Sequence, residues 1–227
     1  TQNTAIFNRA KELSNLITGT SGEFNLENLV LDKDIYLTFA GRTATKLNIS
    51  GFVTYGGLKT SCLFKGDDSK GLSSLTNLEG VEINITNAEP LSMGAIISRK
   101  TNWYDVYIHG ATRDGIYFRA FDANNESPYF CNLTNVWSKS NARNGVTFTD
   151  NCNANVLTNG QFDSNGERGV VQTQVSHGDT PIAVYNNTLI NGQASYNQLD
   201  GIYVERGSEF IVSGTYTEFN SQADGGN

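Results

Sequence analysis

The chain has 227 residues, a formal net charge of −7 and a sequence pI of about 4.8. This length allows one large domain or two small ones, and the acidic balance without a basic tract excludes electrostatic capture of nucleic acid or anionic lipid. No apolar stretch approaches the roughly 20 residues of a membrane span. We therefore expect no nucleic-acid partner and no membrane insertion.

A single helix is predicted near the start of the sequence. Residues 4–17 place apolar side chains on one stripe at helical spacing, and Asn3 or Thr4 can cap the first turn. The stripe consists of Ile6, Phe7, Ala10, Leu13, Leu16 and Ile17. Only strand-like sequence follows. The helix is therefore expected to cover the open end of a stack of strands, where apolar core and strand edges would otherwise be exposed.

Alternating apolar and polar runs begin at Phe24, and a short phrase recurs in the second half of the sequence. Each copy is a turn residue, a glycine and an alternating run, as in Asp114–Phe118 and Asn144–Phe148, and again at Gly169 and Gly201. A fixed phrase at intervals of about 20–50 residues is typical of stacked repeats. This phrase predicts a turn that leads into a strand. The repeat unit is therefore expected to be a coil of strands.

Two rows of polar residues keep a fixed spacing from the repeated glycines. Asn141, Asn165 and Asn197 lie four positions before a glycine, and a second row lies ten positions before one: Asp105, Asn135, Asn159 and Asn191. Identical amides at fixed register would stack on coils about 4.8 Å apart and hydrogen-bond along the stack. An inward apolar ladder is predicted at Leu133, Leu157 and Leu189.

The sequence contains three cysteines: Cys62, Cys131 and Cys152. An odd number without CxxC spacing excludes a disulfide framework and argues against a zinc site. We interpret them as small buried side chains, and we expect no metal and no cofactor.

The helical segment Thr4–Leu16, the Gly–Ile/Val strand starts and the two asparagine rows resemble the right-handed parallel β-helix proteins of the pectate-lyase-like superfamily. The resemblance is strongest to bacteriophage tailspikes and surface-polysaccharide depolymerases. It implies an all-β solenoid with an N-terminal amphipathic capping helix. Residues 1–23 would form the helix and the segment that leads into the first coil, and residues 24–227 the β-helix. Because the last residues stop at a coil boundary, we expect a β-helix truncated at its C-terminal end.

The resemblance also implies a biological setting: a homotrimer in an extracellular place on a virion tail, with a bacterial surface polysaccharide as ligand. No motif matches the signature of a specific activity. Catalytic residues therefore cannot be transferred from the family and have to be sought among the exterior side chains.

A first candidate surface lies on the strand before each glycine turn, at positions that alternate with inward residues and should face solvent. These positions hold Tyr107 and His109 on one coil, Trp137 and Lys139 on the next, and then Gln161 and Asp163. Aromatic faces pack on sugar C–H groups, and neighbouring titratable groups can divide acid and base roles. The alternative is that the aromatic residues raise strand propensity and that Lys139–Asp163 is a surface ion pair.

A second candidate surface comes from two coils that carry extra length, at Asp122–Tyr129 and Ser176–Tyr185. Both insertions fall between the same two strands, so they should project from one edge and enclose a trough. The trough would be lined by Asp122, Glu126, Asp150 and Asp179. Glycoside hydrolysis needs two carboxyl groups roughly 5–10 Å apart. The alternative is that these loops are acidic because the whole protein is.

Arg113 and Arg143 occupy equivalent positions, two before their glycines, with Glu167 next in the column and Asp114 adjacent. Neutralisation by these acids is one explanation of the stacked arginines. The other is capture of a sugar carboxylate, which guanidinium geometry suits.

Two function classes remain open. The first is a tailspike-like depolymerase, either a glycoside hydrolase or a polysaccharide lyase. Its catalytic candidates are Glu126, Asp150 and Asp163, and its substrate-binding candidates are Tyr107, His109, Trp137, Lys139, Arg143, Asp122 and Asp179. The second is a non-catalytic glycan-binding module of a tail fibre or cell-surface protein. The same surface would serve both, and the fold alone does not decide between them.

Overall fold

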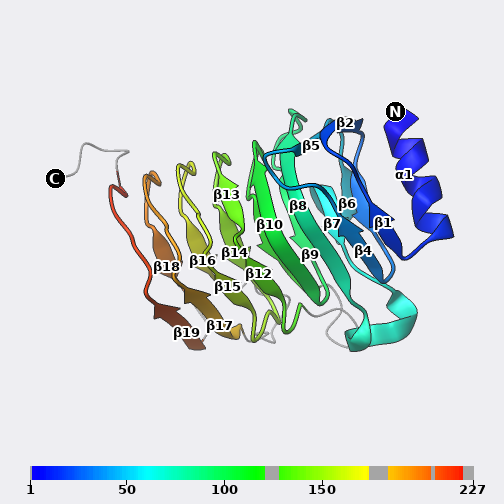
Figure 1. Ribbon diagram of the computed structural model, residues 1–227. Helices are drawn as coiled ribbons and strands as arrows, with labels where there is room; N and C mark the ends of the chain where they lie inside the picture. The colour runs from blue at the N-terminus through cyan, green and yellow to red at the C-terminus, as the bar shows by residue number, and fades with distance from the viewer. Residues whose placement is uncertain (1, 121–127, 174–183, 206–207, 222–227) are drawn as a thin grey trace.

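The computed structural model describes residues 2–120, 128–173, 184–205 and 208–221. The described chain is a stack of coils with one helix at its amino-terminal end, and the two ends of the chain lie at opposite ends of the stack (Figure 1). The helix is α1 (Gln2–Leu13), and one 3-10 turn, η1 (Asp68–Ser73), projects from an early coil. No helix within the described ranges is long and apolar enough to cross a membrane.

The strands form two long sheets, of eleven and eight strands within the described residues. We call the larger one sheet A; it contains β1 (Leu16–Thr18), β2 (Gly22–Leu26), β4 (Ile35–Thr38), β5 (Thr45–Ile49), β8 (Thr76–Ile85), β10 (Thr101–His109), β12 (Asn132–Thr134), β13 (Trp137–Lys139), β15 (Val156–Thr158), β17 (Tyr185–Ile190) and β19 (Ser208–Ser213). Sheet B contains β3 (Leu29–Leu31), β6 (Val53–Tyr55), β7 (Leu58–Phe64), β9 (Met93–Ile97), β11 (Ile116–Phe118), β14 (Val146–Phe148), β16 (Val170–Gln172) and β18 (Ile202–Val204).

The described strand pairs are parallel, except for the hairpin of β6 and β7. Parallel neighbours that are consecutive coils of one chain require a solenoid, since each strand must travel around the stack before it returns beside itself. The predicted fold is confirmed: the protein is a right-handed parallel β-helix with an N-terminal helix.

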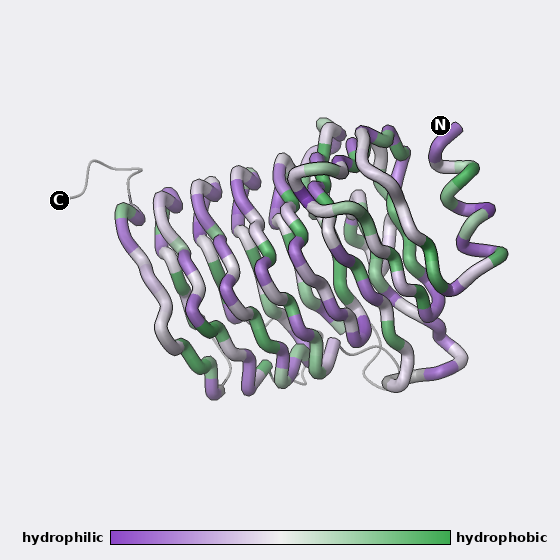
Figure 2. The backbone as a smooth tube through the Cα atoms, in the orientation of Figure 1, coloured by the Kyte–Doolittle hydropathy of each residue, from purple (hydrophilic) through white to green (hydrophobic). Residues whose placement is uncertain are grey.

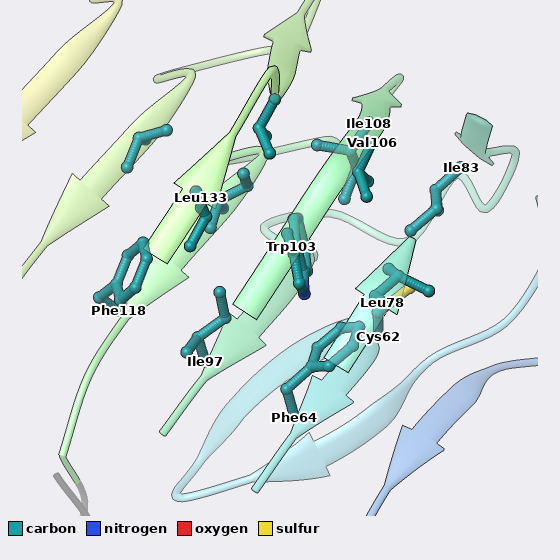
Figure 3. Close-up of a cluster of buried hydrophobic side chains, with 14 of the residues drawn as sticks. Cys62, Phe64, Leu78, Ile83, Ile97, Trp103, Val106, Ile108, Phe118 and Leu133 are labelled. Carbon is teal, nitrogen blue, oxygen red and sulfur yellow. The ribbon is translucent and has the colours of Figure 1, made fainter. Parts of the chain in front are cut away.

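The interior is a continuous column of apolar side chains. Ile116, Val146, Val170 and Ile202 lie in register on sheet B, and Leu133, Leu157 and Leu189 do so on sheet A, as predicted. The rings of Phe118 and Phe148 stack with centroids 4.6 Å apart. Figure 3 shows Phe118, Leu133 and Trp103 turned into the same core, and Figure 2 shows apolar and polar residues alternating along the coils.

The three cysteines are free thiols buried in this core, as the sequence predicted. Burial in apolar surroundings disfavours a thiolate, and it raises the pKa of Cys131 to about 12. These thiols are therefore packing groups, not reactive ones.

The first asparagine row forms a buried amide ladder. Asn141 donates from Nδ2 to Oδ1 of Asn165 at 3.0 Å, Asn165 donates to Asn197 at 3.1 Å, and Asn197 donates to Asn220 at 3.1 Å. Each amide oxygen also accepts the backbone N–H of the preceding coil's asparagine. The ladder therefore satisfies backbone donors at a turn inside the protein, where an unpaired group would be costly.

The second row is superposed as predicted, because the residues just before its members pair in register from coil to coil. Its members share a left-handed backbone conformation. The φ angles are 54° for Asp105, 55° for Asn135, 53° for Asn159 and 49° for Asn191. Asparagine and aspartate adopt this conformation at lower cost than other side chains. The row thus marks a sharp bend in each coil, such as the one between β12 and β13 at Asn135.

A third ladder was not predicted. Asn155 donates from Nδ2 to Oδ1 of Asn187 at 3.0 Å, and both amides are buried. Oδ1 of Asn155 accepts the backbone N–H of Cys131 on the neighbouring coil. This ladder supports the turn where sheet B gives way to sheet A.

The recurring glycines lie where a neighbouring coil leaves no room for a side chain. A Cβ atom on Gly145 would lie 2.6 Å from the carbonyl oxygen of Gly169, and one on Gly169 would lie 2.6 Å from the oxygen of Gly201. Neither glycine has a left-handed φ. The glycine is therefore required because consecutive coils and the amide ladder approach it closely.

Helix α1 corrects one prediction. It ends at Leu13, and Leu16 and Ile17 belong to β1. The predicted apolar stripe is only partly buried: Phe7 and Ile17 pack against the core, but Ile6 is 60% and Leu13 is 70% exposed. Polar contacts set the orientation of the helix about its own axis, and the apolar spacing of the sequence does not reveal them. Lys11 donates from Nζ to the carbonyl oxygen of Val30 and forms an ion pair with Asp32.

Candidate functional site

The predicted exterior columns exist on sheet A. Tyr107 pairs with Trp137, which pairs with Gln161, and Gln161 with Gln193. The alternating residues Val106, Ile108 and Val136 are buried, as predicted. The rings of Tyr107 and Trp137 meet edge to face with centroids 5.9 Å apart. The sequence therefore placed these side chains on the correct face and on adjacent coils.

The titratable groups of this face are already engaged. Nε2 of His109 lies 3.0 Å from Glu82, and Nζ of Lys139 lies 3.1 Å from Asp163. Asp163 also accepts the backbone N–H of Ser195 at 2.9 Å and is only 5% exposed. The prediction of a solvent-facing carboxylate at this position is wrong. The ion pair between Lys139 and Asp163 is the alternative that the sequence had left open.

Trp137 is covered as well. The guanidinium carbon of Arg42 lies 3.6 Å from the centroid of the Trp137 ring, and Nζ of Lys139 lies 4.6 Å from it. Arg42 also pairs with Asp105 at 3.1 Å and donates to the carbonyl oxygen of Asn135 at 2.9 Å. Arg42 thus clamps an early loop onto later coils. The cation–π contact takes up the ring face that a sugar would need.

The predicted trough is largely outside the described residues, since Asp122, Glu126 and Asp179 all fall in undescribed segments. Asp150 is described, and it is 0% exposed. Its Oδ2 lies 3.7 Å from Nε of Arg119, which is also buried. The prediction that Asp150 forms an exposed trough floor is wrong, because the carboxylate points into the coil and forms an ion pair there.

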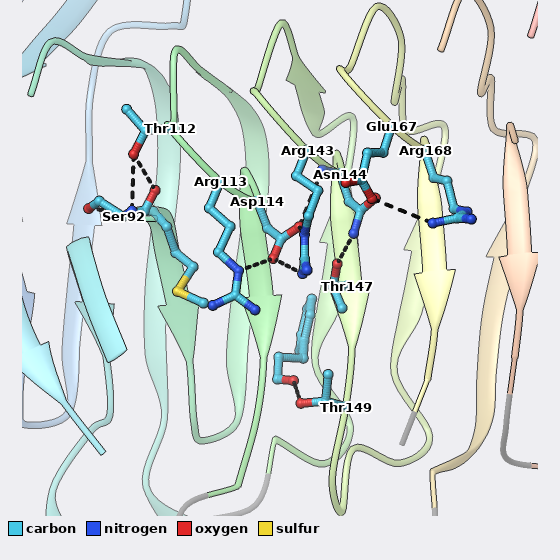
Figure 4. A network of polar contacts seen from close by, with 12 residues as sticks. Ser92, Thr112, Arg113, Asp114, Arg143, Asn144, Thr147, Thr149, Glu167 and Arg168 are labelled. Atoms are coloured by element: carbon cyan, nitrogen blue, oxygen red, sulfur yellow. Dashed lines mark hydrogen bonds and ion pairs between the residues drawn. The ribbon is translucent and has the colours of Figure 1, made fainter. Parts of the chain in front are cut away.

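The outer face of sheet B carries a different feature, which we call the arginine cleft. It is a hollow of about 240 Å³ over β11, β14, β16 and β18, lined by Arg113, Tyr117, Arg143, Asn144, Thr147, Thr149, Glu167, Arg168, Val171, Thr173, Tyr203 and Glu205. Arginines from three successive coils lie along one side of the hollow (Figure 4). Cationic groups with planar donors, next to aromatic and hydroxyl groups, are suited to anionic and hydroxylated ligands.

A buried carboxylate holds two of these arginines. Arg143 donates from Nε and Nη2 to the two oxygens of Asp114, at 2.9 and 2.6 Å, and Arg113 lies 3.6 Å from the same carboxylate (Figure 4). Asp114 is fully buried, and its single negative charge can balance only one of the two positive charges. Burial opposes the charge on Arg143, but the ion pair outweighs burial and raises the pKa of Arg143.

The third arginine, Arg168, pairs with two carboxylates, Glu167 at 3.5 Å and Asp200. Nε of Arg168 lies 2.9 Å from Asp200, an exposed carboxylate, and the guanidinium carbon lies 4.2 Å from the ring centroid of Tyr203. Tyr117 closes the other end of the cleft; it packs in a second apolar cluster with Met93 and Ile96. Burial raises the pKa of Tyr117. The cleft thus has an aromatic ring at each end and arginines between them.

The described carboxylates of the cleft do not form a pair. Glu167 lies two positions before Gly169, whereas Glu205 lies four positions after Gly201. Glu167 pairs with Arg168, and Glu205 accepts a hydrogen bond from the hydroxyl group of Thr173. Each carboxylate therefore has a partner other than the second carboxylate.

The sequence predicted Arg143 correctly as a member of an arginine column but missed Arg168, Tyr203 and Glu205. Arg168 lies one position before its glycine instead of two, so it does not fit the register of Arg113 and Arg143. The described residues also contain no group of three or more His, Cys, Asp or Glu side chains that could hold a metal ion.

No protein-family model and no curated protein matches the chain. Solved structures do share its fold. ORF18 of Geobacillus virus E2 superposes with a TM-score of 0.67 and 16% identity, over 90% of this chain and 42% of that one. The tailspike gp49 of the Acinetobacter baumannii bacteriophage Fri1, a capsular polysaccharide depolymerase, gives 0.53 and 12%, over 88% and 43%.

The A-module of the Azotobacter vinelandii mannuronan C-5 epimerase AlgE4 gives a TM-score of 0.51 and 13% identity, over 97% of this chain and 73% of that one. The chain therefore spans less than half the length of the two phage proteins. At these identities the comparisons establish the shared parallel β-helix fold.

Proposed function

We propose that this β-helix acts on an acidic bacterial surface polysaccharide, as a tailspike-type depolymerase located on a virion tail. The observation that carries the proposal is the arginine cleft: three guanidinium groups from successive coils, held by ion pairs with Asp114, Glu167 and Asp200, beside two aromatic rings. The coil spacing of about 4.8 Å presents these donors as a regular row along which an extended glycan can lie. The likeness to a phage depolymerase supports this choice of substrate class.

The catalytic groups are a further part of the proposal. Asp150 and Asp163 are held in ion pairs and are buried, so we retain Glu126 as the candidate acid. Glu126 lies outside the described residues, in the segment that follows β11 in the sequence. If the reaction is an elimination, Arg143 would stabilise the charge that develops on a uronate carboxylate. The products distinguish the two reactions: elimination leaves unsaturated ends and hydrolysis does not.

Digestion of an acidic capsular polysaccharide tests the reaction. A depolymerase releases oligosaccharides; new ultraviolet absorbance from unsaturated ends identifies a lyase, and new reducing ends without that absorbance identify a hydrolase. If acidic capsular polysaccharides bind in the cleft but yield no fragments, the depolymerase proposal fails and the binding proposal stands.

Arg168→Gln tests the cleft directly. Arg168 is 24% exposed and its partner Asp200 is also exposed, so its replacement leaves no buried charge behind. Loss of a charge-assisted hydrogen bond costs about 1.5–3 kcal/mol, so the Kd for an acidic oligosaccharide should rise roughly 10- to 100-fold. The control is Arg9→Gln, which makes the same charge change on α1 at an exposed ion pair. Equal affinities of the two variants in calorimetry would contradict the proposal.

A non-catalytic adhesion module is the second candidate. One observation favours it: two of the three residues predicted as catalytic, Asp150 and Asp163, are buried in ion pairs. Unchanged chain length of the bound glycan after incubation would support this candidate.

We further propose that the protein assembles as a homotrimer. Its support is the resemblance of the sequence to bacteriophage tailspikes, which implies a homotrimer. The mass in solution, measured by light scattering, should be three times 24.7 kDa. A monomeric mass at micromolar concentration would contradict it.

A further inference from the structure

A second groove lies on sheet A, on the outer surface of β4, β8, β10 and β12, which run side by side (Figure 1). We call it the tyrosine groove. It consists of two adjoining hollows of about 200 and 280 Å³ that share Tyr36 and Asn77. Its members include Tyr36, Glu79, Tyr104 and Thr134, and a row of three amides, Asn77, Asn102 and Asn132. None of these residues belongs to the arginine cleft or to the Tyr107 column.

Two exposed aromatic rings flank the groove. Tyr36 is 41% and Tyr104 is 51% exposed, so a ligand can reach both rings. Tyr36 is two strands and two residues away from Tyr104 in the sheet register, so the two Cα atoms are roughly 12 Å apart. The Tyr36 hydroxyl donates to Glu79 at 2.6 Å, which holds its ring in place. Rigid aromatic surfaces spaced along a groove can pack against the C–H faces of sugars.

The three amides continue the row of Tyr36 across β8, β10 and β12, and they have spare hydrogen-bonding capacity. Asn102 donates to Asn77 at 3.2 Å and accepts from Asn132 at 3.3 Å. A primary amide has two donor hydrogens and two acceptor lone pairs, so this ladder uses half of the capacity of Asn102. Asn132 is exposed, unlike the amides of the buried ladder. A ladder of outward amides offers donor and acceptor side by side, which matches vicinal hydroxyl groups.

The groove differs from the cleft in its charged groups, because none of the described residues that line it is an arginine. Its one cation, within the described residues that line it, is Lys70, and this lies 2.6 Å from Asp34. Glu79 is the other charged group, so the groove carries no excess positive charge. An anionic sugar would be repelled by Glu79, whereas a neutral one can donate a hydroxyl hydrogen to it.

We infer that the tyrosine groove is a second glycan-binding site, which takes a neutral, hydroxyl-rich glycan segment. Tyr36 and Tyr104 stack on sugar faces, and the Asn77–Asn102–Asn132 ladder hydrogen-bonds the sugar hydroxyl groups. The site is independent of catalysis in the arginine cleft. It would hold a neutral stretch of surface glycan against sheet A while the cleft holds an acidic one on sheet B.

The inference is tested by saturation-transfer NMR with maltohexaose, cellohexaose and mannohexaose as neutral probes. At least one of these should bind the wild-type protein, and Tyr104→Ala or Tyr36→Ala should weaken that binding by about five- to tenfold. Both rings are exposed, so neither substitution should unfold the protein, and an unchanged circular dichroism spectrum checks this. Asn102→Ala should also weaken binding.

The chain offers a matched control. Asn48 sits in another outward amide ladder, donating to Asn25 at 3.1 Å and accepting from Asn84 at 2.9 Å, but no exposed tyrosine flanks it. Asn48→Ala should bind the neutral probes like the wild type. Arg168→Gln should also bind the neutral probes like the wild type. The proposals for the groove and for the cleft can therefore be refuted independently. Absence of binding by all three probes, or full binding by Tyr104→Ala, would overturn the inference.

Discussion

Replacement of Asn165 by alanine is expected to lower the free energy of unfolding by about 3–5 kcal/mol. The side chain is buried, and its Oδ1 accepts from both the backbone N–H and the Nδ2 of Asn141, at 3.2 and 3.0 Å. Its Nδ2 donates to Asn197 and to the carbonyl oxygen of Ser138. Alanine would leave these buried groups unpaired on two sides of the coil, with no route for water.

The free energy should be measured by urea denaturation, followed by circular dichroism. Asn132→Ala is the control, because it removes the same amide from an outward ladder where water can take over its hydrogen bonds. Its effect should stay within about 0.5 kcal/mol. Should Asn165→Ala also remain within that range, the buried ladder would not be a main source of stability.

Gly145→Ala is expected to destabilise the protein by about 3 kcal/mol, since overpacking of this kind typically costs 1–3 kcal/mol and here the obstacle is backbone. The new Cβ would meet the Gly169 oxygen at 2.6 Å, Nδ2 of Asn165 at 2.9 Å and the Ser138 oxygen at 3.0 Å. The backbone of one coil would have to move away from the next, and the amide ladder would be strained with it.

Gly57→Ala separates crowding from backbone conformation. Gly57 has a φ of 76° and no atom within 4 Å of its added Cβ, so only the left-handed backbone is penalised, by about 1 kcal/mol. The thermal midpoints of the two variants, compared with the wild type, give the ranking. A smaller loss for Gly145→Ala than for Gly57→Ala would refute the close-approach explanation of the repeated glycines.

The fold could be predicted because a solenoid repeats the same environment, so residues with the same task recur at the same register. Asn141, Asn165 and Asn197 show this most clearly. The third ladder could have been found in the same way: Asn155 and Asn187 each lie fourteen positions before a glycine. Two copies alone, with Cys131 in the preceding coil, form a weak pattern.

The site was less predictable, because the contacts that decide it join distant segments. Nothing in the sequence places Arg42 over Trp137, yet that contact takes up the predicted aromatic surface. Similarly, the acidic character of Asp150 suggested a catalytic group, but Arg119 on the neighbouring coil makes it half of a buried ion pair. Residue type indicates which chemistry is available, whereas partners across coils determine whether it is exposed.

The central claim is that an acidic glycan lies on sheet B, in the arginine cleft. A crystal structure of the protein with an acidic capsular oligosaccharide tests it most directly. We expect a sugar carboxylate within hydrogen-bonding distance of the guanidinium of Arg168 or Arg143, with the chain lying between Tyr117 and Tyr203. An acidic oligosaccharide seated over Trp137 on sheet A, with the cleft empty, would contradict the claim.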